Sequence, residues 1–257
     1  MPLIDAPLVN RPVWFDLSTS DLTAAKALYG ELFDWNFYDA GPDFGHYTMA
    51  HTPNGRSAAA IAPKMPGQEQ SPVVWTVYWG TSDIEATVAR IEGNGGRLMF
   101  PPMDIPDTGR MAIAFDPEGA AFGLWQARPF GGAGIEGEHG AMCWSEVNCR
   151  DGAKNGAFYA AVFDLDVHKM DAPGVVYHTL HPKSGGDPVC GVLQMDAQWG
   201  EIQPAWMPYF AVADLDTANA VWAKHGGKNI AGPIPSPYGR IMVVQDPQGA
   251  YLSYMAG

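Results

Sequence analysis

The chain has 257 residues, of which 47% are hydrophobic and 17% are charged, and its formal net charge is −13 at pH 7. This length accommodates two domains of ordinary size, and the composition indicates a folded protein rather than a disordered one. The excess of acidic residues argues against binding to nucleic acid, and no apolar run approaches the roughly 18 residues that a membrane span needs.

The N-terminus lacks the basic stretch and apolar core of a secretory signal, so we expect a cytoplasmic protein. Its cysteines are an odd set without a C-x-x-C motif, which favours reduced thiols over disulfides or a cysteine metal site. They are Cys143, Cys149 and Cys190.

The first half of the chain predicts a regular series of strands and helices. Residues 13–18 alternate as a strand does, and Asp21 is placed to cap a helix that ends near Phe33. A hairpin that begins at Gly109 closes the series. The other expected strands are 46–51, 57–62, 72–80 and 97–100, and a second helix covers 83–92.

The hairpin occurs twice. The segment GRMAIAFDPEGA begins at Gly109, and GRIMVVQDPQGA begins 130 residues later at Gly239. In each copy the Asp-Pro-x-Gly sequence favours a tight turn between two strands. Trp14, Tyr29 and Tyr47 have counterparts at the same offset in Trp144, Tyr159 and Tyr177. The chain is therefore a tandem duplication, with domains expected at 1–127 and 142–257 and a Gly-rich linker at 128–141.

These features resemble the vicinal oxygen chelate superfamily, which includes glyoxalases, bleomycin-resistance proteins and extradiol dioxygenases. The resemblance rests on the first strand with its Asp21 helix, on the helices that begin at Asp83 and Asp214 and end in Gly-Gly, and on both hairpins. The resemblance covers nearly the whole chain, and the chain is similar to two-domain members of actinobacterial type. It implies an α+β fold in which each repeat has two βαβββ modules curled into a half-open barrel around a cavity.

Enzymes of this superfamily carry one metal ligand, usually His, Glu or Gln, on each of four strands. The resemblance places these positions at Trp14 and Trp144, Val77 and Pro208, Gly123 and Ser253, and near Ala59 and Gly191. None of these residues is a good donor for a divalent metal. We therefore expect neither a metal nor another cofactor.

Aromatic residues and carboxylates are expected on the cavity face instead, because residues two apart in a strand share a face. The candidate ligand-binding residues are Trp14, Trp75, Trp79, Tyr47 and Arg110 in the first repeat, and Trp144, Trp206, Phe210, Tyr177 and Arg240 in the second. Asp16 and Glu146 are the candidate catalytic residues, because desolvation beside tryptophans raises the pKa of a carboxyl group.

Each of these assignments has a structural alternative. Buried aromatic rings usually fill a core, and a carboxylate is often held by backbone amides or by arginine. Arg110 and Arg240 could be those partners, could recognise an anionic group, or could form ordinary salt bridges.

Three functions are compatible with the sequence, which leaves open whether the protein is an enzyme. The first is metal-independent binding of a small hydrophobic or aromatic metabolite, for sequestration or antibiotic self-resistance. The second is catalysis in secondary metabolism, a lyase, isomerase or hydroxylase-like step with Glu146 or Asp16 as general acid or base. The third is a metal-dependent lyase or dioxygenase with relocated ligands. Both halves of a cavity lie on one chain, so we expect a monomer or a homodimer whose two cavities need not be equivalent.

Overall fold

The computed structural model describes residues 3–172 and 174–257, and the two repeats contain matching elements. The first repeat comprises β1 (Pro12–Thr19), α1 (Leu22–Phe33), β2 (Asn36–Asp39), β3 (Thr48–His51), β4 (Ser57–Pro63), β5 (Val74–Gly80), α2 (Ile84–Gly93), β6 (Arg97–Ile105), β7 (Gly109–Phe115) and β8 (Ala121–Ala127). The second comprises β9 (Met142–Cys149), α3 (Gly152–Phe163), β10 (Leu165–Ala172), β11 (Val175–Pro182), β12 (Cys190–Gln194), β13 (Ala205–Ala211), α4 (Leu215–Lys224), β14 (Lys228–Ser236), β15 (Gly239–Gln245) and β16 (Tyr251–Ala256).

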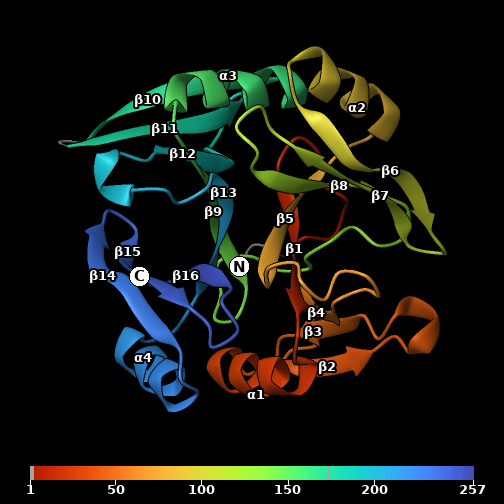
Figure 1. The fold of residues 1–257 in the computed structure, drawn as a ribbon, viewed down its shortest axis with the longest axis vertical. Helices are drawn as coiled ribbons and strands as arrows, with labels where there is room; N and C mark the ends of the chain where they lie inside the picture. Colours follow the sequence, from red (N-terminus) through yellow and green to blue (C-terminus); the bar gives the residue numbers. More distant parts are fainter. Residues whose placement is uncertain (1–2, 173) are drawn as a thin grey trace.

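Each repeat forms one eight-stranded mixed sheet. The first sheet has the order β2-β3-β4-β1-β5-β8-β7-β6, and the second has the order β10-β11-β12-β9-β13-β16-β15-β14. The two orders agree strand for strand, so the predicted α+β fold with a tandem duplication is confirmed. Both sheets curl without closing into a barrel, and Figure 1 shows them side by side.

The local signals in the sequence explain where the elements begin and end. The side chain of Asp21 accepts a hydrogen bond from the Ala24 amide at 2.9 Å and caps α1, as expected. Two strands differ from the prediction. β6 extends beyond the predicted residues 97–100 to Ile105, because it pairs with β7 as far as Gly109. No strand was predicted at the short edge strand β2.

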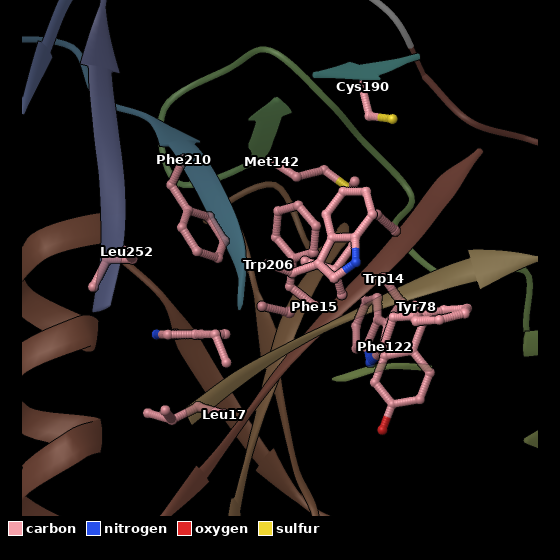
Figure 2. Close-up of a cluster of buried hydrophobic side chains, with 14 of the residues drawn as sticks. Trp14, Phe15, Leu17, Tyr78, Phe122, Met142, Cys190, Trp206, Phe210 and Leu252 are labelled. Carbon is pink, nitrogen blue, oxygen red and sulfur yellow. The ribbon is translucent and has the colours of Figure 1, made fainter. Parts of the chain in front are cut away.

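The two repeats share one hydrophobic core between their sheets. Phe15 from β1 packs against Phe210 from β13, with ring centroids 5.5 Å apart, and Trp79 from β5 stacks on Phe163 at 4.1 Å. Figure 2 shows side chains of both repeats in this cluster, among them Phe15, Leu17, Phe122, Trp206, Phe210 and Leu252. The face of each sheet that meets the other repeat is called the inner face below, and the opposite face is called the concave face.

The turn aspartates tie each repeat to the other. Tyr29 of α1 donates a hydrogen bond to Asp246 Oδ2 at 2.9 Å, and Tyr159 of α3 donates one to Asp116 Oδ2 at 3.1 Å. Both aspartates are 2% exposed. The helices pair across the repeats as well, α1 with α4 and α2 with α3, at opposite ends of the molecule (Figure 1).

Within the described residues, none of the helices is both long enough and apolar enough to cross a membrane. The three cysteines are free thiols.

Candidate functional site

The concave face of the second sheet carries a buried carboxylate held by two tyrosines. Glu146 of β9 accepts a hydrogen bond from the Tyr177 hydroxyl at Oε2 and one from the Tyr209 hydroxyl at Oε1, both at 2.8 Å. The indole of Trp144 donates to the Tyr177 hydroxyl at 2.9 Å. Glu146 is 6% exposed, so it faces the interior of the curled sheet rather than bulk solvent.

The first sheet has the same arrangement at the matching positions. Tyr47 of β3 donates a hydrogen bond to Asp16 Oδ2 at 3.1 Å and accepts one from the indole of Trp14 at 2.8 Å. Tyr78 of β5 also donates to Asp16. The structure therefore brings together six of the residues chosen from the sequence, three in each repeat: Trp14, Asp16 and Tyr47, and Trp144, Glu146 and Tyr177. These two groups, with Tyr78 and Tyr209, are called the carboxylate clusters below.

Burial dominates the electrostatics of both clusters. It raises the pKa of Asp16 from 3.8 to about 6, against the hydrogen bonds from Tyr78, Tyr47 and Thr76, which lower that pKa. Burial likewise raises the pKa of Glu146, and the hydrogen bonds from Tyr209 and Tyr177 oppose the rise. Burial, with the nearby carboxylate, keeps the pKa of Tyr177 and Tyr209 well above 10, so both phenols are neutral donors.

Four of the aromatic residues predicted for the cavity lie on the inner face instead. In the pairing of β1 with β5, Trp14 lies opposite Tyr78, so both side chains lie on the concave face, and Phe15 lies opposite Val77, so both lie on the inner face. Trp75 and Trp79 are each two residues from Val77 and therefore lie on the inner face as well. The corrected residues are Trp75, Trp79, Trp206 and Phe210, each at most 5% exposed. They pack between the repeats, and the Trp75 and Trp206 indoles donate to Tyr29 and Tyr159.

The predicted arginines do not reach the carboxylates. Arg110 forms ion pairs with Glu85 at 2.7 Å and with Asp104 at 3.0 Å, which is the ordinary salt bridging considered above. Arg240 lies exposed on β15. Neither of them is a partner of Asp16 or Glu146 in the part of the chain that the structure describes.

Tyr78 and Tyr209 are the site residues that the sequence reasoning missed. Each follows directly after a position that the resemblance gave to a metal ligand, Val77 in β5 and Pro208 in β13. The recurrence of a tyrosine before Trp79 and before Phe210 was visible in the sequence and could have identified them.

A cavity of about 780 Å³ reaches one residue of the second carboxylate cluster, Trp144, whereas Glu146, Tyr177 and Tyr209 are not part of its lining. Trp144 forms part of its wall, together with the N-terminal segment around Arg11, the linker at Glu136, and the ends of the strands around Pro188. Cavities of roughly 300–1,000 Å³ are typical of small-molecule sites.

Comparison with known proteins identifies the family of the chain. The Glyoxalase/Bleomycin resistance protein/Dioxygenase superfamily matches residues 11–124. The chain is 41% identical over 252 residues to "Putative glyoxylase CFP32" of Mycobacterium tuberculosis (strain CDC 1551 / Oshkosh), a match that covers 96% of this chain and 94% of that protein. The chain belongs to this superfamily. It is also 33% identical to the anthracycline biosynthesis protein DnrV of Streptomyces peucetius, over 95% of this chain and 92% of that protein.

Solved structures of the superfamily share the fold at low identity. The 2,3-dioxygenase LapB from Pseudomonas sp. KL28 superimposes with a TM-score of 0.65 at 13% identity, over 98% of this chain and 93% of that one. The Mn(II)-bound glyoxalase from Novosphingobium aromaticivorans superimposes with a TM-score of 0.64 at 14% identity, over 96% of this chain and 82% of that one. These matches establish the fold alone.

The residues present do not fit the metal centre that the superfamily implies. Gly123 lies under the ring of Tyr78, where an added Cβ would lie 2.1 Å from Tyr78 Cδ1, and Gly191 lies under the Tyr177 hydroxyl, 1.9 Å from such a Cβ. Tyrosine side chains therefore fill the space that a ligand side chain from either position would enter. Among residues 3–172 and 174–257, no three His, Cys, Asp or Glu side chains converge as metal ligands do.

Proposed function

We propose that this protein binds a small hydrophobic or aromatic metabolite at its carboxylate clusters, without a metal. The observation that carries the proposal is the hydrogen bonding of Glu146. Among the described residues it accepts only the two tyrosine hydroxyls, one on each oxygen. A carboxylate has about four acceptor positions, so each oxygen retains capacity for a donor on a ligand.

The surroundings of the cluster favour a flat, mainly apolar ligand. Trp144 is half-buried, shares the concave face with Glu146 two residues along β9, and is one of the residues that line the cavity. Aromatic walls with a few placed polar groups are typical of such sites, and the carboxylate would fix the orientation of a hydroxyl group. The name of the Streptomyces peucetius relative, an anthracycline biosynthesis protein, points to the same polycyclic aromatic class.

The test is isothermal titration calorimetry of the purified full chain with a panel of polycyclic aromatic compounds, one of them an anthracycline. We expect saturable binding by at least one compound, and a loss of about tenfold in affinity for a hydroxylated ligand in Glu146→Gln, since a hydrogen bond to a charged group contributes roughly 1.5–3 kcal/mol. The matched control is Glu92→Gln, an exposed glutamate of α2. The absence of saturable binding across the panel would refute the proposal.

A second function, general acid or base catalysis by the same carboxylates, is favoured by one observation. Burial brings the pKa of Asp16 to about 6 and also raises that of Glu146, and a catalytic acid or base works best with a pKa near the working pH. In the same experiment, a compound that is chemically changed would identify catalysis. Turnover would then be lost in Glu146→Gln or Asp16→Asn while binding remains measurable. Full turnover in both variants would exclude the two carboxylates as the general acid or base.

A further inference from the structure

Asp16, in the first carboxylate cluster, has hydrogen-bond donors but no cation beside it. Its donors are the hydroxyl groups of Tyr47, Tyr78 and Thr76. No Lys, Arg or His side chain within residues 3–172 and 174–257 forms an ion pair with it. A carboxylate that is partly withdrawn from water is normally paired, so the partner that would balance its charge is missing.

The groups that face Asp16 leave it as a negative charge at neutral pH. Burial raises its pKa to about 6, which still keeps it ionised at pH 7. Burial, and next the charge of Asp16, keeps the pKa of Tyr47 and of Tyr78 well above 10, so both phenols stay neutral. Ala60 of β4 and Thr76 of β5 lie opposite Asp16 and do not titrate. The net charge of −13 adds to the attraction of this point for a cation.

The first cluster is more open than the second on its concave face. Three matched positions differ, namely Asp16, Ser18 and Thr76 in the first sheet, and Glu146, Asn148 and Met207 in the second. At each position the second repeat has the larger side chain. The three residues of the first sheet are partly exposed, whereas those of the second are only 6%, 5% and 8% exposed. A donor on a ligand can therefore approach Asp16 from the concave face.

The strands next to Asp16 offer apolar surface for the body of such a ligand. Asp16 pairs with Ala60, which pairs with Met49 of β3. Met49 in turn pairs with Tyr38 of the edge strand β2, so all four side chains lie on the concave face. Met49 is partly buried, and Tyr38 is 66% exposed. The row from Asp16 to the edge of the sheet therefore contains no second charge.

We propose that the first carboxylate cluster binds the ammonium group of a primary amine, which donates to Asp16 while the apolar body of the ligand lies over Met49 and Tyr38. An ammonium group carries three N–H donors and the positive charge that the hydroxyl partners of Asp16 do not supply. This inference rests on the proposed function and adds the charge of the ligand at one of the two clusters.

The test compares 2-naphthylmethylamine, a cation at neutral pH, with 2-naphthylmethanol, a neutral compound of the same shape, by isothermal titration calorimetry on the full chain. At about pH 7.5 we expect the amine to bind about tenfold more tightly, because its hydrogen bond joins two charged groups. Asp16→Asn should bring the two affinities to within about twofold. The control is Asp43→Asn, which removes an exposed carboxylate of the same repeat and should keep the preference. Circular dichroism checks the folding of both variants.

A second measurement needs no variant. Asp16 is mostly protonated at about pH 5, below its pKa of about 6, whereas the amine remains a cation. The preference of the wild-type protein for the amine over the alcohol should therefore largely disappear between about pH 7.5 and about pH 5. An unchanged preference across this range would contradict an ion pair with Asp16.

The remaining outcomes separate this inference from the proposed function. Equal affinities of the amine and the alcohol for the wild-type protein at about pH 7.5 would overturn the inference. A preference that survives in Asp16→Asn, or that is lost only in Glu146→Gln, would overturn the assignment to the first cluster. If neutral members of the aromatic panel bind and the amine gains nothing, the ligand charge alone is wrong; if neither naphthalene compound nor any member of the panel binds, the proposed function fails as well.

Discussion

The hydrogen bond between Tyr29 and Asp246 should contribute strongly to stability, because it joins the two repeats in a dry interface. Tyr29 is fully buried, and its hydroxyl donates to Asp246 Oδ2 at 2.9 Å while it accepts the Trp75 indole N–H at 3.3 Å. Tyr29→Phe removes the donor and the acceptor together without changing the packing of the ring.

The expected cost follows from the two groups that lose a partner. A hydrogen bond to a charged group contributes about 1.5–3 kcal/mol, and an unsatisfied buried N–H costs about 1–3 kcal/mol. The long indole bond belongs at the low end, so we expect Tyr29→Phe to lower the free energy of unfolding by about 3 kcal/mol. With a urea slope of about 3 kcal/mol per M for a chain of this size, the unfolding midpoint should fall by about 1 M.

The assay is urea unfolding followed by circular dichroism, with Tyr38→Phe as the matched control. Tyr38 is 66% exposed, so its substitution should change the free energy of unfolding by less than about 0.5 kcal/mol. Tyr159→Phe tests the pseudo-symmetric bond and should behave as Tyr29→Phe does. A midpoint for Tyr29→Phe within error of the Tyr38→Phe midpoint would refute the view that the turn aspartates hold the repeats together.

Two further predictions concern the concave faces. The pKa of Asp16 is raised from 3.8 to about 6, so the folded state holds this proton more tightly than the unfolded state. The protonated carboxyl group therefore stabilises the fold fully below about pH 4, and this contribution is lost as the pH rises through about 6. The loss lowers the free energy of unfolding by up to about 3 kcal/mol. Urea midpoints at pH 4 and pH 7 should differ less in Asp16→Asn than in the wild type, and an unchanged difference would contradict the shift. Gly123→Ala should destabilise the fold by about 1–3 kcal/mol because its Cβ would overlap the Tyr78 ring, whereas Gly93→Ala, whose Cβ would meet nothing within 4 Å, should not; equal thermal midpoints would contradict this close packing.

The duplication made much of the fold predictable from the sequence. Comparing the chain with itself identified the hairpins at Gly109 and Gly239 and the caps at Asp21 and Asp83, because turn and cap chemistry is local. Strand register depends on partners far away in the sequence. β1 pairs with β5 with an irregularity between Pro12 and Trp14, which no local signal reports.

This register explains why the site was predicted only in part. Trp14 and Asp16 share a face by simple alternation within one strand, and the structure brings them together with Tyr47. The assignment for β5 required knowing which face of that strand points inward. Aromatic residues occupy both faces there, Trp79 on one and Tyr78 on the other, so hydrophobicity could not decide between them.

A series of hydrogen bonds from tryptophan to tyrosine to an acidic residue serves a structural role on the inner faces and a candidate binding role on the concave faces. On the inner face Trp206 donates to Tyr159, which donates to Asp116. On the concave face Trp144 donates to Tyr177, which donates to Glu146.

The two series differ in what else reaches the carboxylate. Asp116 Oδ1 accepts the amides of Glu118 and Ala120, and its Oδ2 accepts Asn155 besides Tyr159, so its acceptor capacity is filled by the protein. Glu146 accepts two phenols and no backbone amide among the described residues. Complete satisfaction makes the turn aspartate a fixed joint between the repeats. Incomplete satisfaction in a buried place leaves Glu146 able to accept a further hydrogen bond, which a water molecule or a ligand can donate without unfolding the sheet.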